Sequence, residues 1–113
     1  MYDHLYCKLY LSSRLDIEEL YECINCLIQG QMDPIRTVKT QWGEMDLRKN
    51  SDFDPQRLEN TPDDFIFWKY YLDIIPQEGI EQTTYIKQIS WLIEELGIRN
   101  IKAVASCEFE DIL

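Results

Sequence analysis

The sequence has few glycines, a single histidine and none of the common catalytic motifs. Only 4 of the 113 residues are glycine, and no glycine-rich phosphate loop, G-x-S-x-G elbow or H-E-x-x-H helix occurs. We therefore expect a protein that is not an enzyme and that needs no cofactor. A small enzyme that uses His4 and Asp73 as an acid–base pair is the alternative, and it would lose its activity in His4→Ala.

Positive charge is scarce as well. The chain has 11 Lys and Arg against 21 Asp and Glu, which gives a formal net charge of −10. Such a protein repels nucleic acid and anionic membranes, whereas its field can accelerate encounter with a basic partner by roughly 10–1000-fold at low salt. Acidity is also common in domains that need only solubility. Both explanations of the charge stay open at this point.

Long hydrophobic runs are absent. No stretch approaches the roughly 18–20 apolar residues of a membrane span, and the N-terminal segment lacks the basic region of a signal peptide. We expect a soluble, cytoplasmic protein with no membrane partner.

Cysteine is limited to four residues. Cys23 and Cys26 form a C-x-x-C pair in the middle of a predicted helix, whereas a redox pair gains its low thiol pKa at a helix N-terminus. A zinc site would need further ligands, for which only Cys7, Cys107 and His4 are available. We expect structural thiols and no metal site.

The apolar pattern predicts one domain, residues 1–113, with elements in the order β-α-β-β-α-β. The expected strands are residues 4–11, 36–48, 65–75 and 101–110, and the expected helices run from Asp16 to Gly30 and over residues 83–97. This order is that of an α+β ferredoxin-like sandwich, in which a four-stranded antiparallel sheet carries two helices on one face.

Local signals refine these elements. Asp16 and Glu19 predict a capping box at the start of the first helix. In the strand 36–48 the alternation changes phase at Gly43, which predicts a β-bulge there. In the last strand, residues 101–110, alternate side chains are expected to face the core, and Phe109 is the last of them.

The helix-free face of this sheet is expected to be aromatic. In the usual strand order the first and third strands are central, which places the following side chains together: Tyr6, Lys8, Tyr10, Phe65, Phe67, Lys69 and Tyr71. Cross-strand pairing explains such residues, and so does a protein interface, of which a homodimer is the simplest form. The acidic charge disfavours RNA binding on this face.

A long acidic loop is predicted at residues 49–64, between the second and third strands. A loop of this length is usually functional or disordered. It contains five acids, namely Asp52, Asp54, Glu59, Asp63 and Asp64.

The C-terminal half of the chain resembles the small acidic immunity proteins of bacterial polymorphic-toxin and contact-dependent growth inhibition systems. The similarity covers roughly the last 50 residues of the sequence. It depends on the strand that ends at Leu72 to Pro76, on the helix pattern Tyr85-Ile86…Ile89-Ser90-x-Leu92-Ile93, and on the closing run Cys107-Glu108-Phe109-Glu110-Asp111.

The resemblance implies a protein that binds one cognate toxin, often a nuclease with a basic groove, and neutralises it in the cytoplasm. Acids of the loop (Asp52, Asp54, Asp63 and Asp64) or of the terminus (Glu108, Glu110 and Asp111) would then contact Lys and Arg of the toxin. Phe53, Trp42 and Tyr71 are the candidate anchors. The alternative is a ferredoxin-like regulatory domain that binds a small molecule as a homodimer.

Overall fold

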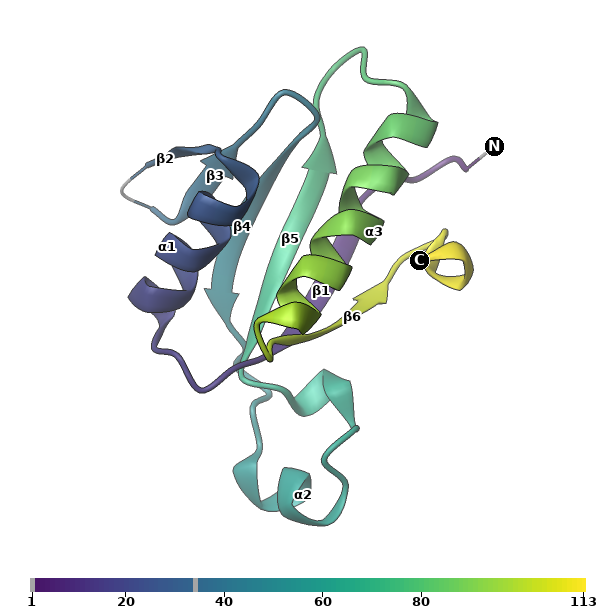
Figure 1. Ribbon diagram of the computed structural model, residues 1–113. Helices are drawn as coiled ribbons and strands as arrows, with labels where there is room; N and C mark the ends of the chain where they lie inside the picture. Colours follow the sequence, from purple (N-terminus) through teal and green to yellow (C-terminus); the bar gives the residue numbers. More distant parts are fainter. Residues whose placement is uncertain (1, 34) are drawn as a thin grey trace.

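The structure is a computed structural model that describes residues 2–33 and 35–113. Within these residues the chain is an α+β fold with a six-stranded antiparallel sheet in the order β2-β3-β4-β5-β1-β6 (Figure 1). The strands are β1 (Cys7–Ser12), β2 (Gln31–Met32), β3 (Thr37–Lys39), β4 (Gly43–Lys49), β5 (Tyr70–Pro76) and β6 (Lys102–Ser106). The helices are α1 (Ile17–Ile28), α2 (Pro55–Asn60) and α3 (Gln82–Ile98).

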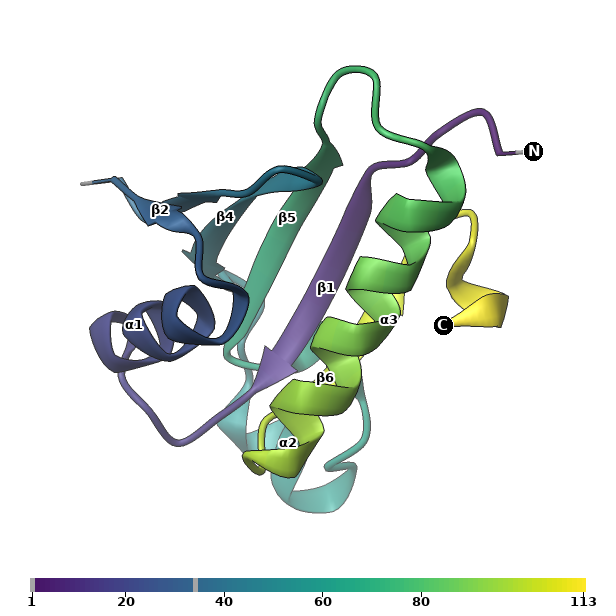
Figure 2. The same ribbon diagram turned by 45° about the horizontal axis from the view of Figure 1, so that its top comes forward.

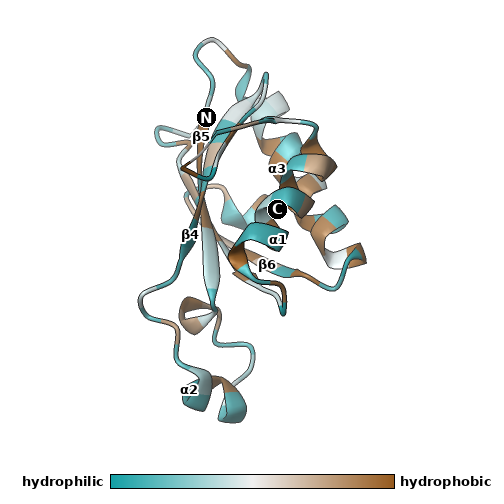
Figure 3. Cartoon of the chain, turned by 90° about the vertical axis from the view of Figure 1, so that its left-hand side faces the viewer, coloured by the Kyte–Doolittle hydropathy of each residue, from teal (hydrophilic) through white to brown (hydrophobic). Residues whose placement is uncertain are grey.

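Two of the helices cover the same face of the sheet. Helices α1 and α3 lie on one side, as Figure 2 shows from above, and among the described residues the opposite face carries no α-helix (Figure 3). The core fills the space between the sheet and these helices because alternate residues of each strand point toward it. In β1 and β5 the inward residues are Cys7, Leu9, Leu11, Tyr70, Leu72 and Ile74, and each of them is at most 1% exposed.

The start of α1 confirms the predicted capping box. The Asp16 carboxylate accepts a hydrogen bond from the Glu19 N–H (2.9 Å), and the Glu19 carboxylate accepts one from the Asp16 N–H (3.3 Å). Both bonds satisfy N–H groups that a helix N-terminus leaves without partners. The hydrogen bond from the Glu19 N–H lowers the pKa of the Asp16 carboxyl group.

The prediction of a four-stranded sheet is wrong in the number of strands, and the expected bulge at Gly43 is a turn. The segment 36–48 folds back on itself as the hairpin of β3 and β4. The Thr40 N–H donates to the Gly43 carbonyl (2.9 Å), and the Thr40 hydroxyl accepts from the N–H groups of Trp42 (3.2 Å) and Gly43 (3.0 Å). The alternation changes phase because the chain reverses direction there.

Two predicted strands are also too long. Residues Phe65–Phe67 form a 3₁₀ helix, and β5 begins only at Tyr70. Strand β6 ends at Ser106, so Glu110 lies in a terminal 3₁₀ helix, Glu110–Ile112, and not on a strand. Phe109 is nevertheless fully buried, as predicted.

No helix in the described part of the chain is long and apolar enough to cross a membrane.

Candidate partner-binding surfaces

The predicted acidic loop is an ordered projection at one end of the sheet. Residues 50–69, here called the knob, connect β4 to β5 and include α2 (Figure 1). Asp54 caps this short helix by accepting a hydrogen bond from the Arg57 N–H (3.1 Å), and Pro55 occupies its first turn. The dipeptide Asp54-Pro55 is therefore a helix-start signal that could have been read from the sequence.

Asn50 fastens the knob at its base. Its side chain is 7% exposed and donates hydrogen bonds to the carbonyls of Ile66 (3.0 Å) and Trp68 (2.7 Å). It also accepts a bond from the Asp52 N–H (3.1 Å). The Trp68 indole, 3% exposed, donates to the Pro62 carbonyl (2.9 Å). These contacts close the two ends of the knob on each other, and neither anchor was identified from the sequence.

The acids of the knob differ in their availability to a partner. Asp64 pairs with Arg57 (2.9 Å), and Asp54 is used as the cap of α2. Asp63 lies 3.7 Å from the ammonium of Lys102 but has a side chain that is 89% exposed. Asp52 is exposed. Asp52 and Asp63 are thus the predicted residues of the knob that remain most accessible.

Two exposed apolar side chains accompany these acids on the knob. Phe53 is 40% exposed and Ile66 is 45% exposed. The Arg57 guanidinium lies over the Phe67 ring, 4.2 Å from its centroid. The knob therefore presents both charge and apolar surface, as a protein contact site does.

The C-terminal acids form a second cluster that is held in place by Phe109. The Phe109 ring packs against Tyr2 (centroids 5.8 Å apart) and Tyr85 (6.1 Å). Glu108 accepts a hydrogen bond from the His4 N–H (2.9 Å). All three predicted acids of this cluster are exposed: Glu108, Glu110 and Asp111.

The two acidic clusters do not meet. Asp63 of the knob contacts Lys102 at the start of β6, whereas residues 108–111 follow its end. Figure 1 shows α2 and the C-terminus in separate parts of the molecule. We therefore treat the two clusters as two separate surfaces.

The predicted anchors Trp42 and Tyr71 lie on opposite faces of the sheet. Trp42 is 8% exposed and packs against Tyr85, with ring centroids 6.1 Å apart. Tyr71 is half-buried on the helix-free face, where the Lys8 ammonium lies 4.3 Å from its ring centroid. Of the two, Tyr71 lies on the helix-free face, whereas Trp42 faces the helices.

The helix-free face joins the knob through aromatic contacts. Tyr10 lies between Tyr71 (centroids 6.4 Å apart) and Phe65 of the knob (5.5 Å). The Tyr6 hydroxyl donates a hydrogen bond to Asp73, and burial together with this bond raises the pKa of Tyr6. Among the described residues, no hydrogen bond or ion pair joins Asp73 to His4, the pair of the enzyme alternative.

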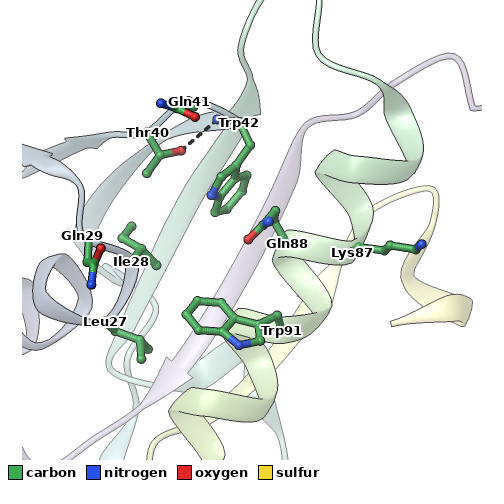
Figure 4. Close-up of a pocket in the computed structure, with 9 residues that line it drawn as sticks. All are labelled: Leu27, Ile28, Gln29, Thr40, Gln41, Trp42, Lys87, Gln88 and Trp91. Atoms are coloured by element: carbon green, nitrogen blue, oxygen red, sulfur yellow. Dashed lines mark hydrogen bonds between the residues drawn. The ribbon is translucent and has the colours of Figure 1, made fainter.

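A groove lies between α1 and α3 on the helix-covered face. It has a volume of about 780 Å³. Figure 4 shows the rings of Trp42 and Trp91 in it, opposite Leu27 and Ile28 of α1, while Lys87 points away. Trp91 is 39% exposed. Sequence reasoning did not identify this groove because its walls come from three separate segments.

The cysteines are all free thiols, and Cys23 and Cys26 lie in α1. In the described ranges, 2–33 and 35–113, no three His, Cys, Asp or Glu side chains cluster so that they could hold a metal ion.

Comparison with protein-family models, with curated proteins and with solved structures finds no match.

Proposed function

We propose that this chain is an immunity protein that binds a basic bacterial toxin domain, such as a nuclease, and neutralises it by occlusion. The observation that carries the proposal is the knob, a projecting segment whose backbone is fastened by Asn50 while Asp52 and Asp63 stay exposed. A preordered arm loses little conformational entropy when it binds, so more of its contact energy appears as affinity.

Charge and apolar surface have separate tasks in this proposal. Carboxylates on the knob imitate the phosphates that a nuclease groove attracts, and the net charge of −10 steers the encounter. Phe53 would insert as the apolar anchor, since buried aromatic residues dominate the energy of many interfaces. Occlusion needs no catalytic group.

The fold can be assigned more finely within the same proposal. We infer that β4, β5, β1 and β6 form a ferredoxin-like core and that the hairpin of β2 and β3 extends it at one edge. The strand order and the antiparallel pairing of these four strands support this assignment. Helix α3 joins β5 to β6, which flank β1, and α1 together with the β2–β3 hairpin joins β1 to β4, which flank β5.

Charge reversal distinguishes the two acidic surfaces. The knob variant carries Asp52→Lys and Asp63→Lys, and the terminal variant carries Glu110→Lys and Asp111→Lys. A matched control, Glu22→Lys with Glu94→Lys, reverses two exposed helical acids far from either cluster in sequence. The proposal predicts that the protein encoded immediately upstream ends in the toxin domain. Binding to that C-terminal domain is measured by calorimetry at low and high salt.

We expect the knob variant to lose about 10-fold or more in affinity, which corresponds to roughly 1.4 kcal/mol, and the control to lose much less. The terminal variant should behave like the control. Equal affinity of the wild type and both cluster variants would refute binding through acidic surface, even if a complex forms.

The groove favours a second function, that of a regulatory domain for a small molecule. Its volume of about 780 Å³ lies within the range of ligand sites, and two tryptophans line it. This alternative expects a homodimer, formed through the helix-free face, whose melting temperature rises with a metabolite. Sedimentation and thermal melts with a panel of amino acids and nucleotides test it, and Trp91→Ala should abolish any shift.

A further inference from the structure

Cys7 and Cys107 face each other where β1 and β6 diverge. The register pairs Lys8 with Ser106, so the next residues along the two antiparallel chains are Cys7 and Cys107. Both side chains pack in the hydrophobic core on the helix-covered face of the sheet. Cys7 is fully buried and Cys107 is half-buried.

The register, continued by one residue beyond its last pair, is compatible with a disulfide between Cys7 and Cys107. Residues directly opposite each other in an antiparallel pair have Cα atoms about 4.5 or 5.5 Å apart. A disulfide joins Cα atoms that are roughly 4.4–6.8 Å apart. Cys23 and Cys26 differ, because both lie on helix α1. Cys26 is exposed and Cys23 is half-buried.

We propose that Cys7 and Cys107 are an oxidation site that closes to a cross-strand disulfide and ties residues 107–113 to the central strand β1. The site is independent of toxin binding. It would, however, fix the terminal acids Glu108, Glu110 and Asp111 relative to the sheet, because these residues follow Cys107 directly.

The oxidant would be a low-molecular-weight disulfide such as oxidised glutathione. The half-buried Cys107 gives up its proton and attacks one glutathione sulfur, so that the glutathione S–S bond breaks and one glutathione thiol leaves. Cys7 then loses its proton and attacks the Cys107 sulfur of this mixed disulfide, which releases the second glutathione. Two electrons pass from the protein to glutathione, and the products are one protein disulfide and two thiols.

Burial makes this reaction slow near neutral pH. It raises the pKa of both Cys7 and Cys107, and only the thiolate attacks a disulfide. The rate should therefore still be rising with pH between pH 7 and pH 9. The pair would stay reduced during brief exposure to oxidant and would close during sustained exposure.

The test uses the full chain with Cys23→Ser and Cys26→Ser, so that Cys7 and Cys107 are its only thiols. The protein is incubated with oxidised glutathione at about pH 8.5, then alkylated and analysed by intact mass and peptide mapping. We expect a mass loss of about 2 Da without a glutathione adduct, and a linked peptide pair containing both cysteines.

The disulfide would close a loop of about 100 residues, so the melting temperature should rise by about 5 °C or more and return after reduction. With Cys7→Ala added, the reaction should stop at a glutathione adduct on Cys107. With Cys107→Ser instead, whose half-buried position tolerates the change, no adduct should form. Two alkylatable thiols, or a lasting adduct on Cys107 while Cys7 is present, would overturn the proposal.

Discussion

Replacing Asn50 with alanine tests whether the knob is preordered. The side chain makes three hydrogen bonds, to the carbonyls of Ile66 and Trp68 and from the Asp52 N–H. Each such bond contributes roughly 0.5–1.5 kcal/mol net, and a buried carbonyl left without a donor costs about 1–3 kcal/mol. We therefore expect Asn50→Ala to lower the free energy of unfolding by about 2–4 kcal/mol, a large share of the roughly 5–15 kcal/mol of a small domain.

Urea unfolding followed by circular dichroism and tryptophan fluorescence measures this loss. Asn60→Ala is the matched control, since Asn60 is exposed and its side chain makes no hydrogen bond among the described residues. The control should stay within about 0.5 kcal/mol of wild type.

If the knob opens separately from the domain, the global loss will be smaller. Amide exchange of Asp54 and Trp68, whose N–H groups bond within the knob, should then accelerate by about 30- to 900-fold. Asn50→Ala with wild-type stability and wild-type exchange would show that this side chain does not hold the knob.

Three further predictions concern two glycines and two buried titratable side chains. Gly30→Ala should lower the free energy of unfolding by about 1–3 kcal/mol, because the added Cβ would lie 2.3 Å from Cγ1 of Val38. Gly97→Ala in α3 should raise it by about 0.5–1 kcal/mol, since nothing lies within 4 Å of its added Cβ. Urea unfolding measures both changes, and a change of the same sign in the two variants would contradict this account. Burial raises the pKa of Cys7 and Tyr85, so the folded state holds these protons more tightly than the unfolded chain does. The resulting stability is complete below the pKa values of the two groups in the unfolded chain, about 8.5 and 10, and is lost as the pH rises above them. Stability that stays constant between about pH 8 and 11 would contradict the last prediction.

Elements with strong local signals could be predicted from the sequence. Helix α1 begins at Ile17 because Asp16 and Glu19 cap it through contacts three residues apart. The inward residues of β1 follow from alternation alone. Burial of Phe109 was predicted from strand alternation and is confirmed, although the strand ends at Ser106. The ring is buried because it packs against Tyr2 and Tyr85.

Elements that depend on distant contacts could not be predicted. The segment 65–67 alternates like a strand, yet Asn50 binds the adjacent carbonyls and holds it as a turn. The phase change at Gly43 has two readings, a bulge or a reversal, and only the Thr40 hydrogen bonds select the reversal.

The candidate site shows the same division. The exposed acids, Asp52 and Asp63 among them, were identified from charge and position. Burial of Trp42 was missed because it depends on a contact with Tyr85 of a different element. The juxtaposition of Cys7 and Cys107 was missed for the same reason, since it requires the β1–β6 register.

Growth rescue tests the central proposal most directly. The toxin domain encoded immediately upstream is expressed from an inducible promoter, alone or together with this chain or with its Asp52→Lys, Asp63→Lys variant. The account predicts that the toxin domain alone stops growth, that the wild-type chain restores it and co-purifies in a salt-sensitive complex, and that the variant restores it poorly. A toxic domain that neither binds the chain nor is neutralised by it would contradict the account.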